Sequence, residues 1–478
     1  MPEGWYLVYW RAISVDGHPV QGVFTFALGP NPGPPPAFPT PSVAQTATST
    51  PLLVARWVMF LSVLTAIGLF VLHMLIAHPL VRRVEGTSLR WLAQAFLAAS
   101  VIGLVAVPVY VEESTSIDSL RSFWAVGALV PLWRVTAYGR AYVDLWICFA
   151  LFCVAACIAL WLDRPSLPRR PVAPLLAMLG ALVAAAAVLA IPGAGGHAAQ
   201  TSPRGVAVFL DWLHLVTAAV WIGGLVGLLV LWRSLAVAQR VAGLLVAVPR
   251  FSNTAFVSVL LLLATGIGAS VLHLPAIAAL WQTSYGKTIL VKAAILLVAM
   301  LVAAVNLLRT KPQLSRAGVG EAAARLLRRL VGVEVILVAG AIFAAALLSS
   351  LAPPPPAFAK EGSALARVGP GPVAATVHRN GYTLRVLVQP NKAVQSNAFA
   401  LQLTRNGSPV RGATITLVFS MLDMEMPDQD YAMRETAPGI YSQRKPALVM
   451  VGHWGLEFSV TPAGGTPFTA FIVDKANG

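Results

Sequence analysis

Three of the eight histidines in this chain lie at or near the ends of apolar segments, beside other side chains that could bind a metal ion. His197 follows a glycine-rich stretch, and His273 ends a later apolar run. Asp211 and His214 are three residues apart, so a helix places both on one face. Met59, in the first apolar run, lies at about the same depth as His214 at a rise of ~1.5 Å per residue. Imidazole, carboxylate and thioether groups together suit copper better than magnesium or calcium.

A histidine inside an apolar helix has a simpler role open to it, which is to pack or to donate a hydrogen bond to a neighbouring helix. Here two polar residues share one face, and two further histidines lie at the same level. Ionisable groups in membrane spans are costly and are usually functional or paired. The sequence therefore predicts a metal site formed by Met59, His197, Asp211, His214 and His273.

A second group of candidate ligands begins with the sequence Met-Leu-Asp-Met-Glu-Met-Pro at residues 421–427. Together with His453 further along the chain, Met424 and Met426 could capture Cu(I) or Cu(II). Alternation along a strand could equally bury both methionines in a core and leave the acidic residues in water. The sequence leaves both alternatives open.

Three further ionisable residues lie within apolar runs. We expect Asp144 and Lys292 to form an ion pair, because each lies near the outer end of its run. Glu334 lies deeper and could line a polar pathway or bond a neighbouring helix. Cys153 and Cys157 are four residues apart on one helical face, where we expect them to pack as small apolar groups.

The elements that position these residues are apolar helices. The chain has 478 residues, of which 57% are hydrophobic and 11% are charged, and its mean hydropathy is +0.74. A soluble protein could not bury this much apolar surface with so few charges, so the fold class is a polytopic α-helical membrane protein. The net charge of +15 comes mostly from short loops without a recognition motif, which disfavours nucleic acid as a partner. Phosphate-binding and catalytic motifs are also missing from the sequence, so we expect neither a nucleotide partner nor an enzyme.

Eight apolar runs are long enough to cross a hydrocarbon core of roughly 30 Å. They are Leu52–Ala77, Ser88–Val111, Gly139–Leu162, Val172–Ile191, Val206–Trp232, Phe251–His273, Gly286–Leu308 and Leu326–Leu351. The shorter stretch Leu120–Thr136 is predicted to be an interfacial or re-entrant helix. Basic residues concentrate in the first, third, fifth and seventh connecting loops, which predicts a cytoplasmic (inner) membrane protein with both termini outside.

Both ends of the chain are predicted to be β structure. Trp5–Ser14 and Val20–Leu28 alternate around an Asp-Gly turn, which is typical of a hairpin. Because a lone hairpin is marginal in water, we expect this incomplete segment to be the end of a longer domain. A proline-rich linker, residues 30–51, follows it. Residues 373–478 alternate through six or seven short strands with turns at Asn380-Gly381 and Asn406-Gly407, which predicts a small β-sandwich.

Several sequence blocks in the central region resemble the copper resistance protein D (CopD) membrane family. They are Gly196-His197-Ala198-Ala199, Leu213-His214 through Trp221-Ile222-Gly223-Gly224, Phe251-Ser252 to Thr265-Gly266, Tyr285-Gly286-Lys287 with Lys292, and Asn306. The resemblance implies a CopD-like transmembrane domain over residues 52–351, with a second linker at 352–372.

The two β regions resemble other families. Residues 1–29, through Trp10–Val20, are similar to the end of a CopC copper-binding domain. In that family the Asp and His of this motif bind Cu(II), which implies that Asp16 and His18 are ligands here; the amino-terminal histidine of that site has no counterpart. The C-terminal domain is similar to YtkA-like β-sandwiches through Gly439–Tyr441 and Met450–Trp454.

These resemblances imply copper transport across the cytoplasmic membrane, most simply import, with an outward-facing His/Asp/Met site loaded from external copper-binding domains. The partners expected are copper ions, the lipid bilayer and a periplasmic or extracellular copper chaperone. One alternative is a scaffold that delivers copper to an external cuproenzyme without transporting it. Another is a membrane redox protein, which would need paired axial haem ligands on facing helices.

Overall fold

The structure is a computed structural model of the chain, and it describes residues 2–13, 19–30, 49–115, 137–163, 172–316, 319–351, 353–423 and 426–478. Within those ranges, eight helices are long and apolar enough to cross a membrane. All eight predicted spans are confirmed, and the chain is a multi-pass membrane protein. The stretch Leu120–Thr136 lies outside the described residues, as do Asp16, His18 and Met424.

The eight spans are built from the following helices. They are α1 (Thr50–Leu72), α3 (Arg90–Thr115), α5 (Ala137–Leu162), α6 (Val172–Gly195), α7 (Arg204–Ser234), α8 (Arg240–His273), α10 (Ser284–Val305) and α12 (Gly320–Leu348). A π-helical turn, His73–Ala77, joins α1 to α2 (His78–Val81), and a second, Asn306–Thr310, joins α10 to α11 (Lys311–Gln313). The short helix α9 (Ala279–Gln282) precedes α10.

The helix α8 begins well before the predicted start of its span at Phe251. Its additional turns are amphipathic and bury Leu244 and Ala247, so packing holds them in the helix although they contain charged residues. Pro249 lies inside α8 without ending it. Hydropathy alone therefore placed this boundary too late.

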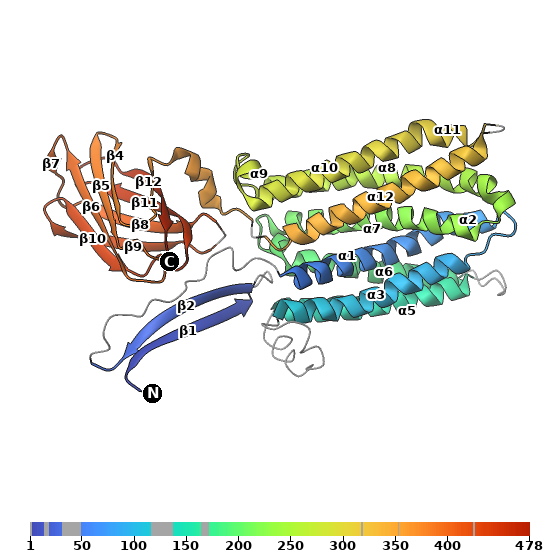
Figure 1. Cartoon of the computed structure of the whole chain (residues 1–478), viewed down its shortest axis with the longest axis horizontal. Coiled ribbons are helices and arrows are strands. Elements are labelled where there is room, and N and C mark those ends of the chain that lie inside the picture. Colours follow the sequence, from blue (N-terminus) through green and yellow to red (C-terminus); the bar gives the residue numbers. More distant parts are fainter. Residues whose placement is uncertain are drawn as a thin grey trace.

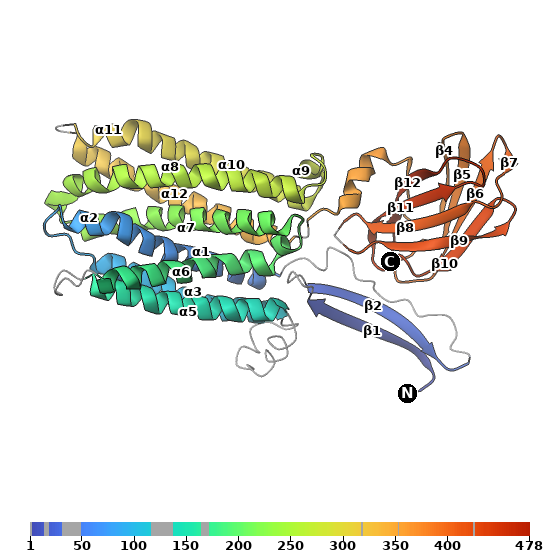
Figure 2. The same cartoon turned by 180° about the vertical axis from the view of Figure 1, so that it is seen from behind.

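Helices α1 and α7 form the centre of the bundle, with α3, α5 and α6 on one side and α8, α10 and α12 on the other (Figures 1 and 2). Glycines allow these two helices to approach closely. A methyl group built on Gly68 would lie 1.9 Å from the carbonyl oxygen of Ala219, and one built on Gly223 would lie 2.3 Å from the Cα of Gly68. Side chains at either position would force α1 and α7 apart.

The outer surface of the bundle carries large apolar side chains. On α8, Phe256 and Val257 are 59% and 56% exposed, and Ile336 on α12 is 72% exposed. In water such a surface would drive aggregation, whereas in a bilayer it faces lipid.

The N-terminal hairpin is confirmed: β1 (Gly4–Ile13) pairs antiparallel with β2 (Pro19–Leu28), with Gly4 opposite Leu28 and Ile13 opposite Pro19. Tyr6 and Phe26 stack across the two strands with ring centroids 5.3 Å apart. In Figure 1 the hairpin and the C-terminal strands lie at the same end of the helix bundle.

The C-terminal domain is the predicted β domain, but its ten strands exceed the expected six or seven. The strands are β3 (Ala366–Val368), β4 (Val373–Arg379), β5 (Tyr382–Gln389), β6 (Asn397–Arg405), β7 (Ser408–Pro409), β8 (Thr414–Met421), β9 (Gln429–Ala437), β10 (Ile440–Lys445), β11 (Gly452–Thr461) and β12 (Phe468–Ala476). Short strands such as β3 and β7 lack room for an alternating pattern, so sequence does not reveal them. The hydrogen-bonded order is β3-β12-β11-β8-β9-β10-β6-β5-β4, with β7 beside β6.

This sheet folds over into two packed layers, as expected for a sandwich. Phe399 on β6 meets Phe419 on β8 at 4.8 Å between ring centroids, although two strands separate them in the sheet. Tyr382 and Phe468 stack at 4.9 Å across the two ends of the sheet. These rings belong to one buried apolar core.

Two Asn-Gly turns and one buried polar pair shape the sandwich. Asn380 and Asn406 have φ values of 50° and 51°, and the φ angle of the glycine after each is also positive, as the predicted tight turns require. The Asn391 amide donates a hydrogen bond to Asp474 at 2.9 Å. Burial raises the pKa of Asp474 to about 6, while the hydrogen bond from Asn391 acts in the opposite direction.

Candidate metal sites

A cavity of about 760 Å³ opens among the spans at the end of the bundle from which the chain termini emerge. Its wall combines residues of all eight spans with the loops before α7 and after α8. Four of the five ligands predicted for the membrane site line this cavity: His197, Asp211, His214 and His273. The sequence thus identified side chains that the fold brings to one place.

The imidazole of His214 is held by a hydrogen bond on each ring nitrogen. Its Nδ1 lies 3.0 Å from Oγ1 of Thr265, whose own proton is directed to the carbonyl of Leu261 at 2.7 Å. Its Nε2 lies 3.3 Å from Nζ of Lys292. Because an ammonium group can only donate, Nε2 must carry the lone pair and Nδ1 the proton. Nε2 is therefore the nitrogen that could bind a metal.

His273 has its tautomer fixed in a similar way. Its Nδ1 lies 2.7 Å from the carbonyl oxygen of Ala269, which can only accept a hydrogen bond, so Nε2 is again the nitrogen available to a ligand. Nε2 is 3.2 Å from Oγ1 of Thr201. The same hydroxyl lies 2.9 Å from the carbonyl oxygen of His197, so Thr201 connects the two histidine-bearing segments.

The charged groups of the cavity are close enough to influence one another. The Asp211 carboxylate interacts electrostatically with Lys292, His273 and His197. Asp211 also lies directly beside Gly193, where a methyl group would be 2.6 Å from a carboxylate oxygen. The absence of a side chain at Gly193 therefore leaves room for the carboxylate at the cavity wall.

Arg56 is a cavity residue that the sequence analysis missed. Although it lies in α1, its guanidinium is buried and donates to the Tyr110 hydroxyl at 2.7 Å and to Ser350 Oγ at 2.6 Å. Its charge also lies over the Tyr110 ring, 5.0 Å from the centroid. A single arginine in an otherwise apolar run was the available signal.

Met59 lies in the apolar core and does not line the cavity, whereas its neighbour Phe60 does. The depth estimate for Met59 says nothing about the rotation of α1, and one residue turns a helix by about 100°.

The predicted pairing of Asp144 with Lys292 is wrong. Lys292 contacts His214, and Asp144 is exposed.

The opposite end of the bundle has its own polar contacts. His73 Nε2 and His78 Nδ1 both contact one carboxylate oxygen of Asp163, at 3.0 and 2.8 Å. Asn306, which begins the π-helical turn after α10, donates to the buried carboxylate of Glu334 on α12 at 2.5 Å. This contact supports the alternative in which Glu334 bonds a neighbouring helix.

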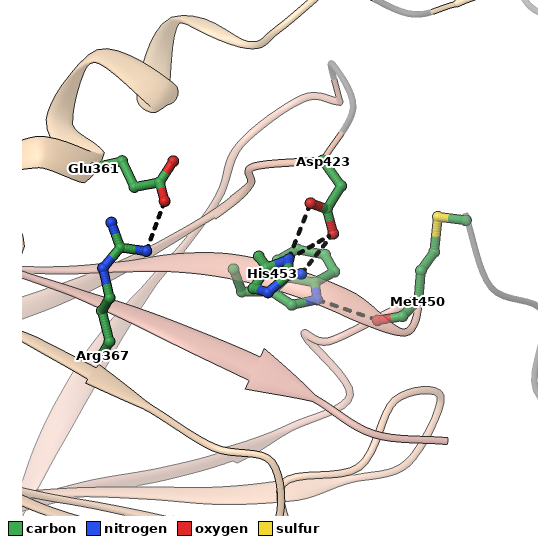
Figure 3. Close-up of polar contacts among 6 residues, drawn as sticks. Glu361, Arg367, Asp423, Met450 and His453 are labelled. Atoms are coloured by element: carbon green, nitrogen blue, oxygen red, sulfur yellow. Dashed lines mark hydrogen bonds and ion pairs between the residues drawn. The ribbon is translucent and has the colours of Figure 1, made fainter. Parts of the chain in front are cut away.

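In the sandwich, His453 lies against Asp423 at the exposed start of β11 (Figure 3). The imidazole Nδ1 is 3.1 Å from one carboxylate oxygen, and the backbone amide of His453 donates to the other at 2.7 Å. The carboxylate accepts, so Nδ1 carries the proton and Nε2 is the nitrogen that could bind a metal. Sequence analysis placed Asp423 in water but did not connect it with His453.

Most methionines of this region pack in the sandwich core. Met421, Met433 and Met450 are buried, and Met426 is half-buried and packs against the same core. In Figure 3 the side chain of Met450 points away from His453. Nearby, Glu361 and Arg367 form an ion pair at 2.7 Å. For the methionines that the structure describes, the placement favours packing over an exposed capture surface.

Across the described ranges, no group of three or more His, Cys, Asp or Glu side chains is arranged to hold a metal ion. The cavity histidines therefore share a wall without forming an assembled coordination sphere. What recurs is the orientation of each imidazole. In His214, His273 and His453, Nδ1 is engaged by an oxygen, and Nε2 is presented as the potential ligand.

The chain is thus a multi-pass membrane protein with a β domain at each end, and comparisons with known families agree with this organisation. Residues 245–348 match the family described as copper resistance protein D, residues 376–459 match the YtkA-like family, and residues 1–29 match the CopC domain. The resemblances predicted from sequence are confirmed in all three regions. The first match includes Thr265, His273 and Lys292 but begins after Asp211 and His214.

The chain is also similar to a curated protein, the copper transport protein CutJ of Bacillus subtilis (strain 168). The two are 25% identical over 472 residues, which covers 96% of this chain and 80% of CutJ. No solved structure matches the chain significantly.

Proposed function

We propose that this protein transports copper across the cytoplasmic membrane through the cavity lined by His197, Asp211, His214 and His273. The observation that carries the proposal is the cavity itself, where two histidines from α7 and α8 have Nδ1 bonded to an oxygen and the Nε2 lone pair directed at a polar group that a metal ion would have to replace, Lys292 for His214 and Thr201 for His273. The similarity to a protein named as a copper transporter supports the choice of copper. Imidazole and carboxylate ligands are also consistent with it.

The incomplete coordination sphere fits transport better than storage. Passage through a membrane protein requires binding that is favourable enough for the ion to enter and weak enough for it to leave. A closed site of four strong ligands would trap copper, whereas a wall of separated ligands lets an ion exchange between them. Met59 lies in the apolar core of the bundle while its neighbour Phe60 lines the cavity, so the proposal needs no thioether ligand from α1.

We further propose that the direction is inward. The cavity opens at the end where both termini emerge, and the basic loops lie at the other end, which is the cytoplasmic side by the positive-inside rule. His453, together with Met424, Asp16 and His18, would supply copper from the outer β regions, loaded by an external copper chaperone, whereas Met426 packs against the sandwich core. The protein would act as a transporter and not as an enzyme.

The copper content of cells that produce the full chain, measured by mass spectrometry, tests this proposal. We expect raised copper with the wild type and a return to background with His214→Ala. His378→Ala is the matched control, because His378 is exposed on β4 and remote from both candidate sites. Accumulation that is unchanged by His214→Ala would contradict the role of the cavity.

The exposed pair of Asp423 and His453 favours a second candidate function, delivery of copper to an external cuproenzyme. That function needs a surface-accessible ligand and no passage across the membrane. It predicts His453-dependent copper binding by the purified protein without copper accumulation in cells. The same cell experiment, combined with a binding measurement on purified protein, separates the two functions.

A further inference from the structure

Lys292 lies where a metal bound to His214 would be. Its Nζ is 3.3 Å from Nε2 of His214, and that nitrogen holds the lone pair, because the Thr265 hydroxyl accepts the Nδ1 proton. The ammonium group thus engages the only lone pair of this imidazole that is available for a ligand. An ion that binds His214 must displace Lys292 from it.

The displaced ammonium has a second partner within the cavity. Asp211 lies one helical turn before His214 on the same face of α7, and it interacts electrostatically with Lys292. The described residues contain no direct Lys292–Asp211 ion pair within 4.0 Å, so this contact is still available. The four-carbon stem of lysine is flexible enough to move its charge by a few ångströms.

The charges also determine which ion the site accepts. Asp211 alone would attract a divalent ion twice as strongly as a monovalent ion, since Coulomb energy is proportional to charge. The Lys292 ammonium repels both ions in the same proportion. With both groups present the two contributions oppose each other, and the usual advantage of a doubly charged ion at a carboxylate is lost.

We propose that Lys292 determines the specificity of the membrane site: it competes with the ion for His214, moves towards Asp211 when the ion binds, and thereby favours Cu(I) over Cu(II). This inference rests on the proposed function, because it requires that copper binds at His214. It assigns Lys292 a role that does not require any change in its protonation.

The test compares purified full-length protein carrying Lys292→Leu with the wild type, Lys292→Arg and Lys287→Leu. Leucine removes the charge and brings no atom that could bind copper, arginine keeps the charge, and Lys287 is an exposed lysine at the start of the same helix. Competition with chelators measures the affinities for Cu(I) and Cu(II). Only the part of the binding that His214→Ala abolishes is attributed to the site.

We expect Lys292→Leu to tighten Cu(I) binding about tenfold and Cu(II) binding about a hundredfold, because the divalent ion gains twice as much free energy. Lys292→Arg and Lys287→Leu should bind like the wild type. Equal gains for the two ions, or no gain, would overturn the inference. So would a loss of binding in a Lys292→Leu protein that elutes as a folded monodisperse species, because Lys292 would then support the site.

Failure of the proposed function is distinguishable from failure of this inference. If the wild type and His214→Ala bind copper equally, the cavity is not the site and the function itself is wrong. If binding depends on His214 but Lys292→Leu leaves both affinities unchanged, only the role of Lys292 is refuted. A Lys292→Gln variant repeats the measurement if Lys292→Leu does not fold.

Discussion

The cavity and the sandwich each present a histidine through Nε2, but they do so in opposite environments. In the cavity, His214 is surrounded by spans and its Nδ1 donates to a neutral hydroxyl, Thr265. In the sandwich, the His453 side chain is 47% exposed and its Nδ1 donates to a carboxylate, Asp423. The buried imidazole has a neutral partner, and the exposed one has a charged partner.

This difference follows from the cost of charge in each place. A carboxylate that is hydrogen-bonded to an imidazole in water needs no further opposite charge, because the solvent screens its charge. Within spans an uncompensated charge costs several kcal/mol, so each one needs an opposite charge nearby. Lys292 and Asp211 satisfy this requirement in the cavity. The membrane site therefore depends on a balance among several groups, whereas the sandwich site depends on one pair.

The most damaging change to this balance should be Asp211→Asn, which leaves Lys292 without its nearby carboxylate. We expect copper accumulation in cells to fall to the background level of His214→Ala, because the remaining ammonium opposes any cation in the cavity. Mass spectrometry of cell copper gives the readout. Asp144→Asn, at an exposed position in α5, is the control and should accumulate copper like the wild type.

A smaller effect is expected from Thr265→Val, which removes the acceptor for Nδ1 of His214 while keeping the shape of the side chain. Loss of such a supporting hydrogen bond typically weakens metal binding by about 10–100-fold. Chelator competition on the purified protein measures it, and Thr265→Ser, which retains the hydroxyl, should restore most of the affinity. If valine and serine behave alike, the orientation of His214 is not set by this hydroxyl.

The corresponding change in the sandwich is Asp423→Asn, and its effect should be smaller still. His453 is partly exposed, so water can replace the lost acceptor, and we expect copper affinity at His453 to fall by only about three- to tenfold. The free energy of unfolding should change by less than about 0.5 kcal/mol, as is usual for exposed pairs. A loss as large as that of Thr265→Val would show that burial does not explain the difference between the two sites.

Asp474→Asn should chiefly alter the stability of the sandwich, in which the carboxyl is buried. With its pKa raised from 3.8 to about 6 by burial, Asp474 holds its proton more tightly in the folded domain than in the unfolded chain. Its contribution to stability is therefore present at low pH and lost as pH rises through 6. We expect Asp474→Asn to add about 1–2 kcal/mol at pH 7 and almost nothing at pH 4. Thermal unfolding of both proteins between pH 4 and pH 7 measures this gain in stability. A gain that stays constant with pH would contradict the raised pKa of Asp474.

Much of the fold followed from local patterns in the sequence. Runs of about twenty apolar residues must cross the bilayer, so all eight spans were predictable, and the two Asn-Gly pairs fixed their turns because both positions need positive φ. Asp211 and His214 could be predicted to lie side by side because residues three positions apart share one face of a helix.

What the sequence could not provide was the contact between helices. Lys292 and His214 are 78 positions apart, and no periodicity indicates which spans are neighbours. For this reason Lys292 was assigned to Asp144, and Met59 was placed at the right depth but on the wrong face for the cavity. The tautomers of His214 and His453 likewise depend on partners from other segments, Thr265 and Asp423.

The close contact of α1 with α7 restricts how an ion can leave the cavity. Because Gly68 and Gly223 bring the two backbones together with no intervening side chains, these helices have little freedom to slide or separate. They form a fixed wall that carries Asp211 and His214. In the proposed transport, an opening towards the opposite membrane face would then come from movement of the other helices that line the cavity, among them α8 and α10 with His273 and Lys292. The fixed wall would keep Asp211 and His214 in place while the helices opposite them move.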